Sequence, residues 1–198
     1  MLLGSFQKIP GEAGCDEAGR GSLVGAVFAA AVILPNDFFH KGIKDSKQLD
    51  FKNREKMRIL IEKESIAYSV KNIEVEMIDR VNVLQATIMA MHASIEGLNQ
   101  KPSYLLVDGN YFKSYPEIPH SCMVKGDSRF MSIAAASILA KTYRDEYMNT
   151  LNLEYPMYNW KQNKGYGTLK HRKAIHIWGM SPYHRKSFRL KEINNHLA

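Results

Sequence analysis

The segment from Ala26 to Leu34 constrains the fold more than any other part of this 198-residue chain. Every residue in it is apolar, Gly25 precedes it and Pro35 stops it. An apolar run of strand length without alternation is typical of a strand that is buried on both faces. Such a strand needs helices on each side of its sheet, so the segment predicts an α/β fold with this strand in the interior of the sheet.

Strand and helix patterns alternate along the rest of the chain. Further strands are expected to end at the acidic pair Asp16–Glu17 and to cover residues 66–70, 104–108 and 120–125. Helices are expected over residues 50–64, 128–151 and 168–179, with Asp50 and Thr168 as N-caps. The clearest helical period predicts one continuous helix that closes near Gly97, and its apolar stripe is Ile78, Val81, Leu84, Ile88, Met91 and Ile95.

Composition limits the class of protein. With 45% hydrophobic residues the chain can bury one good core, and nothing marks a domain boundary, so residues 1–198 are expected to form a single domain. No apolar run approaches the roughly 20 residues of a membrane helix, and the first residues lack the pattern of a signal peptide. Cys15 and Cys122 make neither a disulfide framework nor a Cys-x-x-Cys metal site. We expect a cytoplasmic monomer that does not associate with membranes.

The C-terminal segment from residue 155 to 198 is basic and rich in aromatic residues. The chain carries a net charge of +7, and no Asp or Glu occurs between Tyr155 and Lys191. Cations contact phosphates and aromatic rings stack on sugars or bases, so this segment is predicted to complete a nucleic-acid-binding face. The alternative is a solvated surface with its aromatic residues turned inward, and that orientation is expected for Trp178 and Phe188.

Three acidic residues follow apolar strands. Asp16 and Glu17 precede the glycine turn that begins with Gly19, and Asp108 precedes Gly109. Ligands of open α/β sheets collect at the carboxyl ends of strands, so these acids are expected at one edge of the sheet. Neighbouring residues of a strand face opposite ways, so Asp16 and Glu17 can share a site only if the chain bends there. Carboxylates that lie this close repel each other, so a fold keeps them where a cation neutralises them or where they do proton chemistry. Beside a glycine turn, the expected ligand is a phosphodiester held by divalent metal.

Other polar residues have simpler interpretations. Asp127 precedes a predicted helix and is either a further metal ligand or an ordinary N-cap. Asp145 and Glu146 are expected to face solvent, and Ser137, among alanines, is expected to be a small packed residue rather than a nucleophile.

Seven segments, in this order, resemble the type 2 ribonuclease H (ribonuclease HII) family. They are residues 16–21, 45–49, 107–109, 125–127, 133–141, 164–168 and 184–188, and the similarity runs from about Ala13 to Phe188. Where the glycine turn of this family usually continues Gly-Arg-Gly-Pro-Leu-Ala-Gly-Pro, this chain has Ser22, Val24 and Ala26. These departures concern the geometry of the turn and leave the acids unchanged.

The resemblance implies a ribonuclease H-like mixed β-sheet flanked by helices, with a basic helical C-terminal segment. It implies cleavage of the RNA strand of RNA–DNA hybrids and incision 5′ of single ribonucleotides in duplex DNA, which leaves 3′-hydroxyl and 5′-phosphate ends. The family's catalytic acids match Asp16, Glu17, Asp108 and Asp127, which would hold two Mg²⁺ or Mn²⁺ ions. One ion would activate water and the other would stabilise the leaving 3′ oxygen.

The resemblance also implies how the substrate is recognised. The turn Gly19-Arg20-Gly21 would read the 2′-hydroxyl, chiefly through backbone atoms, because this group distinguishes RNA from DNA. Tyr166 would lie against the sugar of the following deoxynucleotide. Arg20 and Lys47 are candidates for phosphate contacts, and Lys47 has the alternative of a solvated residue after a turn.

Three rival functions remain open. A dinucleotide-binding oxidoreductase is disfavoured, because the third glycine of Gly-x-Gly-x-x-Gly falls at Val24 and the acids would repel a pyrophosphate. A different metal nuclease on a similar sheet would differ in its choice of substrate. A catalytically silent nucleic-acid-binding module is disfavoured because every matching acid is present.

Overall fold

A five-stranded mixed β-sheet forms the centre of the molecule. The computed structural model describes residues 2–7, 9–44, 46 and 49–190. The strands are β1 (Glu12–Ala18), β2 (Val27–Ile33), β3 (Ala67–Ile73), β4 (Tyr104–Asp108) and β5 (His120–Met123), in the order β3-β2-β1-β4-β5. The pairs β1–β2 and β2–β3 are antiparallel, whereas β1–β4 and β4–β5 are parallel. The α/β class and the mixed sheet are therefore confirmed.

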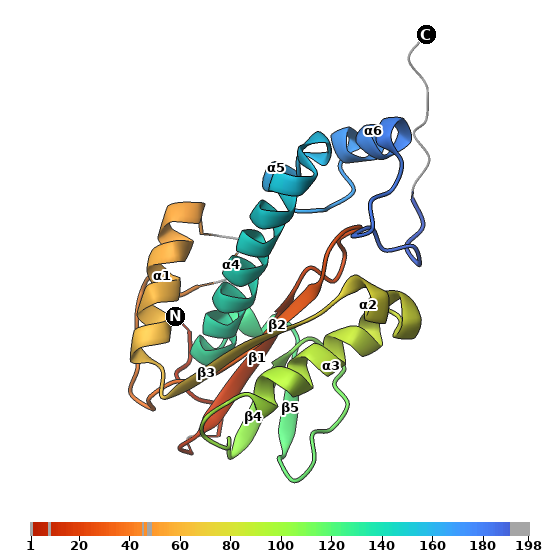
Figure 1. Cartoon of the computed structure of the whole chain (residues 1–198). Coiled ribbons are helices and arrows are strands. Elements are labelled where there is room, and N and C mark those ends of the chain that lie inside the picture. Colours follow the sequence, from red (N-terminus) through yellow and green to blue (C-terminus); the bar gives the residue numbers. More distant parts are fainter. Residues whose placement is uncertain (1, 8, 45, 47–48, 191–198) are drawn as a thin grey trace.

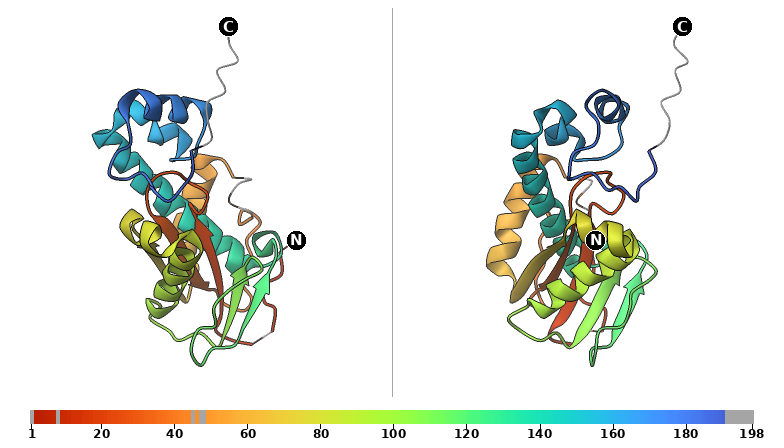
Figure 2. Two further views of the ribbon diagram at one scale, coloured as in Figure 1. Left: turned by 90° about the vertical axis from the view of Figure 1, so that its right-hand side faces the viewer. Right: turned by 45° about the vertical axis from the view of Figure 1, so that its right-hand side comes forward.

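Helices cover both faces of the sheet (Figure 1). On one face lie α1 (Phe51–Glu64) and the long α4 (Met131–Glu154), and on the other lie α2 (Val75–Val81) and α3 (Val83–Glu96). Beyond the end of the sheet, α4 continues to the short α5 (Trp160–Asn163) and to α6 (Leu169–Trp178), as two turned views show (Figure 2). This arrangement leaves the carboxyl end of β1 between the sheet and the C-terminal helices.

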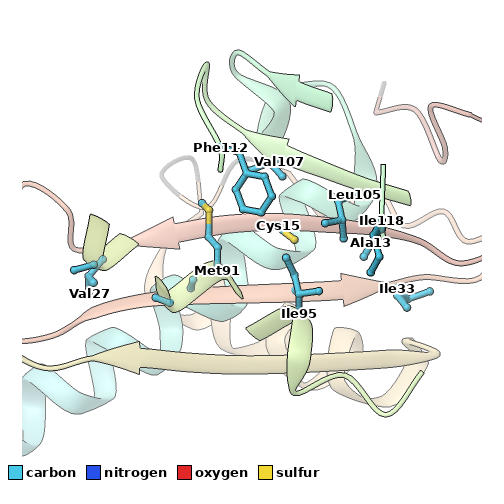
Figure 3. Close-up of a cluster of buried hydrophobic side chains, with 14 of the residues drawn as sticks. Ala13, Cys15, Val27, Ile33, Met91, Ile95, Leu105, Val107, Phe112 and Ile118 are labelled. Atoms are coloured by element: carbon cyan, nitrogen blue, oxygen red, sulfur yellow. The ribbon is translucent and has the colours of Figure 1, made fainter. Parts of the chain in front are cut away.

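Strand β2 is buried along its whole length, as its apolar sequence predicts. Val27, Ala29, Ala31 and Ile33 belong to the cluster that the sheet shares with α3. Figure 3 shows part of this cluster, in which Cys15 of β1 lies among the side chains from neighbouring strands and from α3. Ala30 and Val32 point the other way, into the cluster under α4. The strand is thus interior, and both of its faces are in the core.

The expected continuous helix from Ile78 to Ile95 is wrong, because the chain breaks at Asn82. This residue has a φ of 69°, and its side chain accepts hydrogen bonds from the N–H groups of Leu84 and Gln85. Asparagine tolerates the left-handed side of backbone space and is a strong N-cap, so it ends α2 and starts α3 while the apolar stripe continues.

The other elements follow the expectations, with shifted ends. Asp50 caps α1 by accepting from the N–H of Asn53, and Thr168 caps α6 by accepting from the N–H of His171. Helix α4 begins at Met131 rather than near residue 128, because Gly126–Ser128 forms a turn of 3₁₀-helix. Within the described part of the chain, no helix is long and apolar enough to cross a membrane.

The C-terminal segment is built on an aromatic cluster. Trp160 stacks on Tyr158, with ring centroids 5.0 Å apart, and its indole N–H donates to Nε2 of His171 (3.0 Å). Phe188 packs against the core, as expected, but Trp178 is 62% exposed and the expectation of an inward orientation is wrong. Trp178 is the last residue of α6, where the helix runs past the cluster that Ile175 joins.

Candidate active site

Asp16 and Asp108 emerge at the same edge of the sheet. Strands β1 and β4 are parallel, and Cys15 lies opposite Val107 in their register. The next residue on each strand is the acid, so the two carboxyl groups leave adjacent strands at the same level. This is the carboxyl edge at which α/β sheets bind their ligands.

Asp16 is buried and faces α4. Its side chain is hydrogen-bonded by Ser137, and its Oδ1 accepts from the N–H of Glu17 at 2.7 Å. Burial raises the pKa of Asp16 well above its ordinary value, and the charges of Glu17 and Asp108 raise the pKa further. An acid in this position favours a cation, because a nearby positive charge offsets both burial and repulsion.

Glu17 lies beside Asp16 in extended backbone, and the chain bends in the segment 18–21, where the glycines predict a turn. Strand β1 continues to Ala18, and the chain turns at Gly19, where φ is +92°. Arg20 follows and its guanidinium Nη1 lies 3.8 Å from Oε1 of Glu17. The structure therefore brings Glu17 within electrostatic reach of Asp16 without a bend between them.

Asp108 is connected to the turn that carries Asp127. The N–H of Gly126 donates to Oδ1 of Asp108 at 2.7 Å, and Asp127 is the next residue, only 7% exposed. The N-cap of α4 is Phe130, so Asp127 does not cap this helix. Among the residues that the structure describes, no three His, Cys, Asp or Glu side chains are gathered closely enough to form a finished metal cage. The four acids thus lie in one region of the sheet edge, but their side chains are not arranged around a single metal position.

The glycine turn, residues 19–25, lies next to Tyr166. A Cβ placed on Gly21 would be 4.0 Å from Cε1 of Tyr166, and the N–H of Leu23 donates to the carbonyl of Gly165 at 2.9 Å. Tyr166 is 41% exposed and thus accessible to a ligand. Gly19, Arg20, Gly21 and Tyr166, which are far apart in sequence, therefore meet beside the acids. Lys47 lies outside the described residues.

Sequence reasoning missed one polar face of α4. Ser137 is packed, as expected, but it also bonds to Asp16, and its Oγ lies 3.0 Å from Oγ of Ser46. Arg144 is fully buried behind the glycine turn. The signal was available, because Ser137, Lys141 and Arg144 are separated by four and three positions and therefore lie on one side of the helix.

The solvent-facing position expected for Asp145 is wrong. Asp145 is 5% exposed, because its carboxylate pairs with Arg54 of α1 at 3.1 Å and with Lys141 one helical turn earlier. These residues line a pocket of about 480 Å³ that also contains Lys161 and Lys164. Burial lowers the pKa of Lys141 and of Lys164. Four cations against one buried acid leave this pocket positive, which suits a phosphate.

Acid should loosen the C-terminal segment through His184. This imidazole is fully buried and accepts from the N–H of Ser181 at 2.8 Å, and burial, with the nearby His171, lowers its pKa from 6.5 to about 4. Below pH 6.5 the unfolded chain binds the proton first, so stability from this group is complete above pH 6.5 and is lost as the pH falls toward 4. Between pH 7.5 and 5 we expect His184 to contribute a loss of about 2 kcal/mol in the free energy of unfolding.

Urea unfolding at the two pH values measures this loss. His184→Asn, which keeps an acceptor for Ser181, should be less stable at neutral pH but should lose about 2 kcal/mol less on acidification. His176→Asn is the matched control, because it removes a histidine from an exposed position on α6, and the loss of stability on acidification should persist in this variant. An equal acid loss in wild type and His184→Asn would contradict the assignment.

Comparison with known proteins gives a consistent result. The family model described as Ribonuclease HII matches residues 13–191. A protein of Parabacteroides distasonis named Ribonuclease HII is 60% identical over 190 residues, which cover 96% of each chain.

Two solved structures share the fold. One is the complex of PCNA with RNase HII from Archaeoglobus fulgidus, with a TM-score of 0.76 and 23% identity over 93% of this chain and 98% of that chain. The other is Bst-RNase HIII in complex with Mn²⁺, with a TM-score of 0.63 and 20% identity over 88% of this chain and 71% of that chain. At these identities the likeness concerns the fold.

Proposed function

Because this chain belongs to the ribonuclease HII family and is therefore an endoribonuclease of the ribonuclease H type, we propose that it also incises duplex DNA 5′ of single embedded ribonucleotides. The products are a 3′-hydroxyl and a 5′-phosphate. On RNA–DNA hybrids it cleaves the RNA strand. We further propose that it acts as a monomer in the cytosol, which suits its two free cysteines.

One observation carries this proposal: the glycine turn and Tyr166 lie together beside the acidic edge. The turn offers backbone atoms at Gly21, where no side chain intervenes, and the ring of Tyr166 is next to it. A 2′-hydroxyl is both a donor and an acceptor, so backbone groups can recognise it, while an aromatic ring supports the adjoining sugar. Recognition of a ribose and hydrolysis of the adjacent phosphodiester thus fall in one place.

The acidic edge fits divalent metal. Asp16, Glu17, Asp108 and Asp127 supply only carboxylate oxygens, which are the ligands that Mg²⁺ and Mn²⁺ prefer. Burial, and then the charges of Glu17 and Asp108, raise the pKa of Asp16, and a cation would offset both effects. Bound there, such ions supply Lewis-acid activation of water and of the phosphodiester. That a protein of the same fold was crystallised with Mn²⁺ supports this assignment.

The cations of the pocket beside Asp145, together with Arg20, would orient the substrate. The pocket with Arg54, Lys141, Lys161 and Lys164 lies between α1, α4 and α5, and Arg20 is half-exposed beside Glu17. These cations can hold backbone phosphates on either side of the reacting bond without reading sequence. Their role is orientation, while the glycine turn supplies selectivity.

A nicking assay tests the proposal. A duplex with one ribonucleotide should be cut at the single bond 5′ of that ribonucleotide in the presence of Mg²⁺ or Mn²⁺, and mapped ends should be 3′-hydroxyl and 5′-phosphate. Excess chelator should abolish the cut, because the acidic edge then lacks its ions. Restoring either ion should restore cleavage.

The matched control is the same duplex with the ribonucleotide replaced by its deoxynucleotide. It should remain intact under identical conditions. Equal cutting of this control would show a different metal nuclease, and cleavage of long hybrids alone would remove the claim of single-ribonucleotide incision.

A further inference from the structure

Arg144 of α4 is completely buried against the back of the glycine turn. Its Nη2 donates to Oγ of Ser22 at 2.7 Å and to the carbonyl of Val24 at 3.1 Å, and its Nε donates to the carbonyl of Ala26 at 3.3 Å. Its Nη1 donates to the carbonyl of Lys164 at 3.0 Å. One guanidinium therefore joins the glycine turn to the loop that carries Tyr166.

A second buried arginine holds the same turn. Arg185 donates to the carbonyl of Gly25 from Nε (2.9 Å) and Nη2 (2.7 Å), and to the carbonyl of Arg20 from Nη1 (3.0 Å). Its own N–H donates to the carbonyl of Leu23 at 2.9 Å. Among the described residues, the hydrogen bonds that the guanidinium of Arg185 donates go to the turn, whereas those of Arg144 join the turn to the Tyr166 loop.

A purely structural role would not explain why a charged side chain is buried at position 144. In the described part of the chain no ion pair joins it to a carboxylate, and all its hydrogen bonds go to carbonyl oxygens and one hydroxyl. Burial of a charge without a paired opposite charge is unfavourable. The planar fork of a guanidinium can, however, hold several acceptors at fixed positions, which a lysine cannot do.

The packing around Arg144 fixes the spacing of the two recognition elements. A Cβ on Gly19 would come within 1.9 Å of Nε of Arg144, so the turn lies directly on the guanidinium. A Cβ on Gly165 would be 2.8 Å from Oγ of Ser22, so the Tyr166 loop lies directly on the turn. The guanidinium carbon of Arg144 is 5.7 Å from the centre of the Tyr166 ring.

Ser22 is the polar group that completes this arrangement. Besides accepting from Arg144, its hydroxyl donates to the carbonyl of Val24 at 2.6 Å and is fully buried. The hydrogen bond from Arg144 therefore restrains the turn at Ser22.

We propose that Arg144 is a positioning residue that sets the spacing between the glycine turn and Tyr166, with Ser22 as its acceptor, and thereby sets the preference for a ribonucleotide over a deoxyribonucleotide. The inference rests on the proposed function, because it concerns how that same site selects its substrate. Arg144 and Ser22 are both fully buried, so the expected effect is on the geometry of recognition.

Steady-state kinetics with two duplexes test it. The duplex with one ribonucleotide is the substrate, and the matching all-DNA duplex is a competitive inhibitor whose Ki reports binding without ribose. For Arg144→Lys we expect kcat/KM to fall about tenfold, because bonds from a charged donor are lost, while the Ki stays within about twofold of wild type. For Ser22→Ala, which removes one acceptor, we expect a fall of about threefold.

Arg58→Lys and Ser94→Ala are the matched controls. Arg58 pairs with Glu62 and Glu146, and Ser94 is a buried serine that donates to the carbonyl of Met91, so neither lies at the turn. Both should leave kcat/KM and Ki unchanged. If Arg144→Lys does not fold, the comparison of kcat/KM with Ki in Ser22→Ala tests the proposal by itself.

If kcat/KM and the affinity for the all-DNA duplex fall together, Arg144 and Ser22 have a structural role only. If neither kcat/KM nor Ki changes in the variants, the proposal is also wrong. If wild type cleaves only a continuous hybrid, the proposed incision of single ribonucleotides fails. The hybrid then serves as the substrate for the same comparison, so the two failures are distinguishable.

Discussion

Asp16→Asn and Asp108→Asn should each lower the rate of cleavage by on the order of a thousandfold or more, while the variants still bind duplex. Asparagine keeps the shape of the side chain but loses the negative charge and one of the two anionic oxygens. Both positions lie at the carboxyl edge of adjacent strands, where hard oxygen ligands would meet a divalent ion. Single-turnover cleavage with saturating enzyme measures this loss, and gel-shift binding measures affinity.

The melting temperature of the Asp16→Asn variant shows whether its loss of activity comes from unfolding. Burial and neighbouring negative charges raise the pKa of Asp16, so the charged carboxylate is unfavourable in the folded protein without a cation. Asp16→Asn should therefore melt at the same temperature as wild type or higher, as expected for a group kept for function at the expense of stability.

Asp37→Asn is the matched control for these substitutions. Asp37 is exposed and follows β2, whose carboxyl end lies at the edge of the sheet opposite to Asp16, because β1 and β2 are antiparallel. This variant should cleave like wild type. Turnover within tenfold of wild type in Asp16→Asn or Asp108→Asn would refute their proposed role as metal ligands.

Local signals in the sequence predicted most of the elements. The unbroken apolar run of β2 reflects burial on both faces, and the caps at Asp50 and Thr168 depend on a hydrogen bond within three residues. Such features need no knowledge of the remaining chain. The placement of Asp16 and Asp108 at one edge follows from the same reasoning, because parallel strands align their carboxyl ends.

Features set by distant partners could not be read in this way. Asp145 follows a cation on an apparently exposed stretch of helix, yet it is buried by Arg54, which lies 91 positions earlier in the sequence. At Asn82 the helix ends although the apolar stripe continues, because the capping hydrogen bonds of this one side chain outweigh the helical periodicity of the apolar residues.

The hydrogen bonds that hold the glycine turn could not be predicted from the sequence for the same reason. Arg144 and Arg185 reach the turn from α4 and from the C-terminal segment, across 120 and 160 positions for their bonds to Val24 and Gly25. In sequence they are two basic residues in basic surroundings. Their role follows only from the acceptors that the fold places around them.

Gly14→Ala should destabilise the protein by about 3 kcal/mol or more, at the upper end of what overpacking costs. A Cβ at this position would lie 2.2 Å from the carbonyl carbon of Ser132 and 2.3 Å from the backbone nitrogen of Ile133. Both contacts are backbone atoms of α4, which cannot rotate away as a side chain can. Helix α4 must therefore move away from β1, or the strand must shift.

Gly4→Ala is the matched control, because its Cβ would meet only the carbonyl oxygens of Asn36 and Phe38, at ordinary distances of 3.5 and 3.9 Å. Neither Gly4 nor Gly14 has a positive φ, so the difference between the two variants isolates the effect of space from that of backbone conformation. Urea unfolding at one pH should show a change below about 1 kcal/mol for Gly4→Ala. A similarly small change for Gly14→Ala would mean that α4 can retreat freely. Since Ser137 reaches Asp16 only because α4 lies this close to β1, such freedom would also remove the reason to expect a fixed acidic edge.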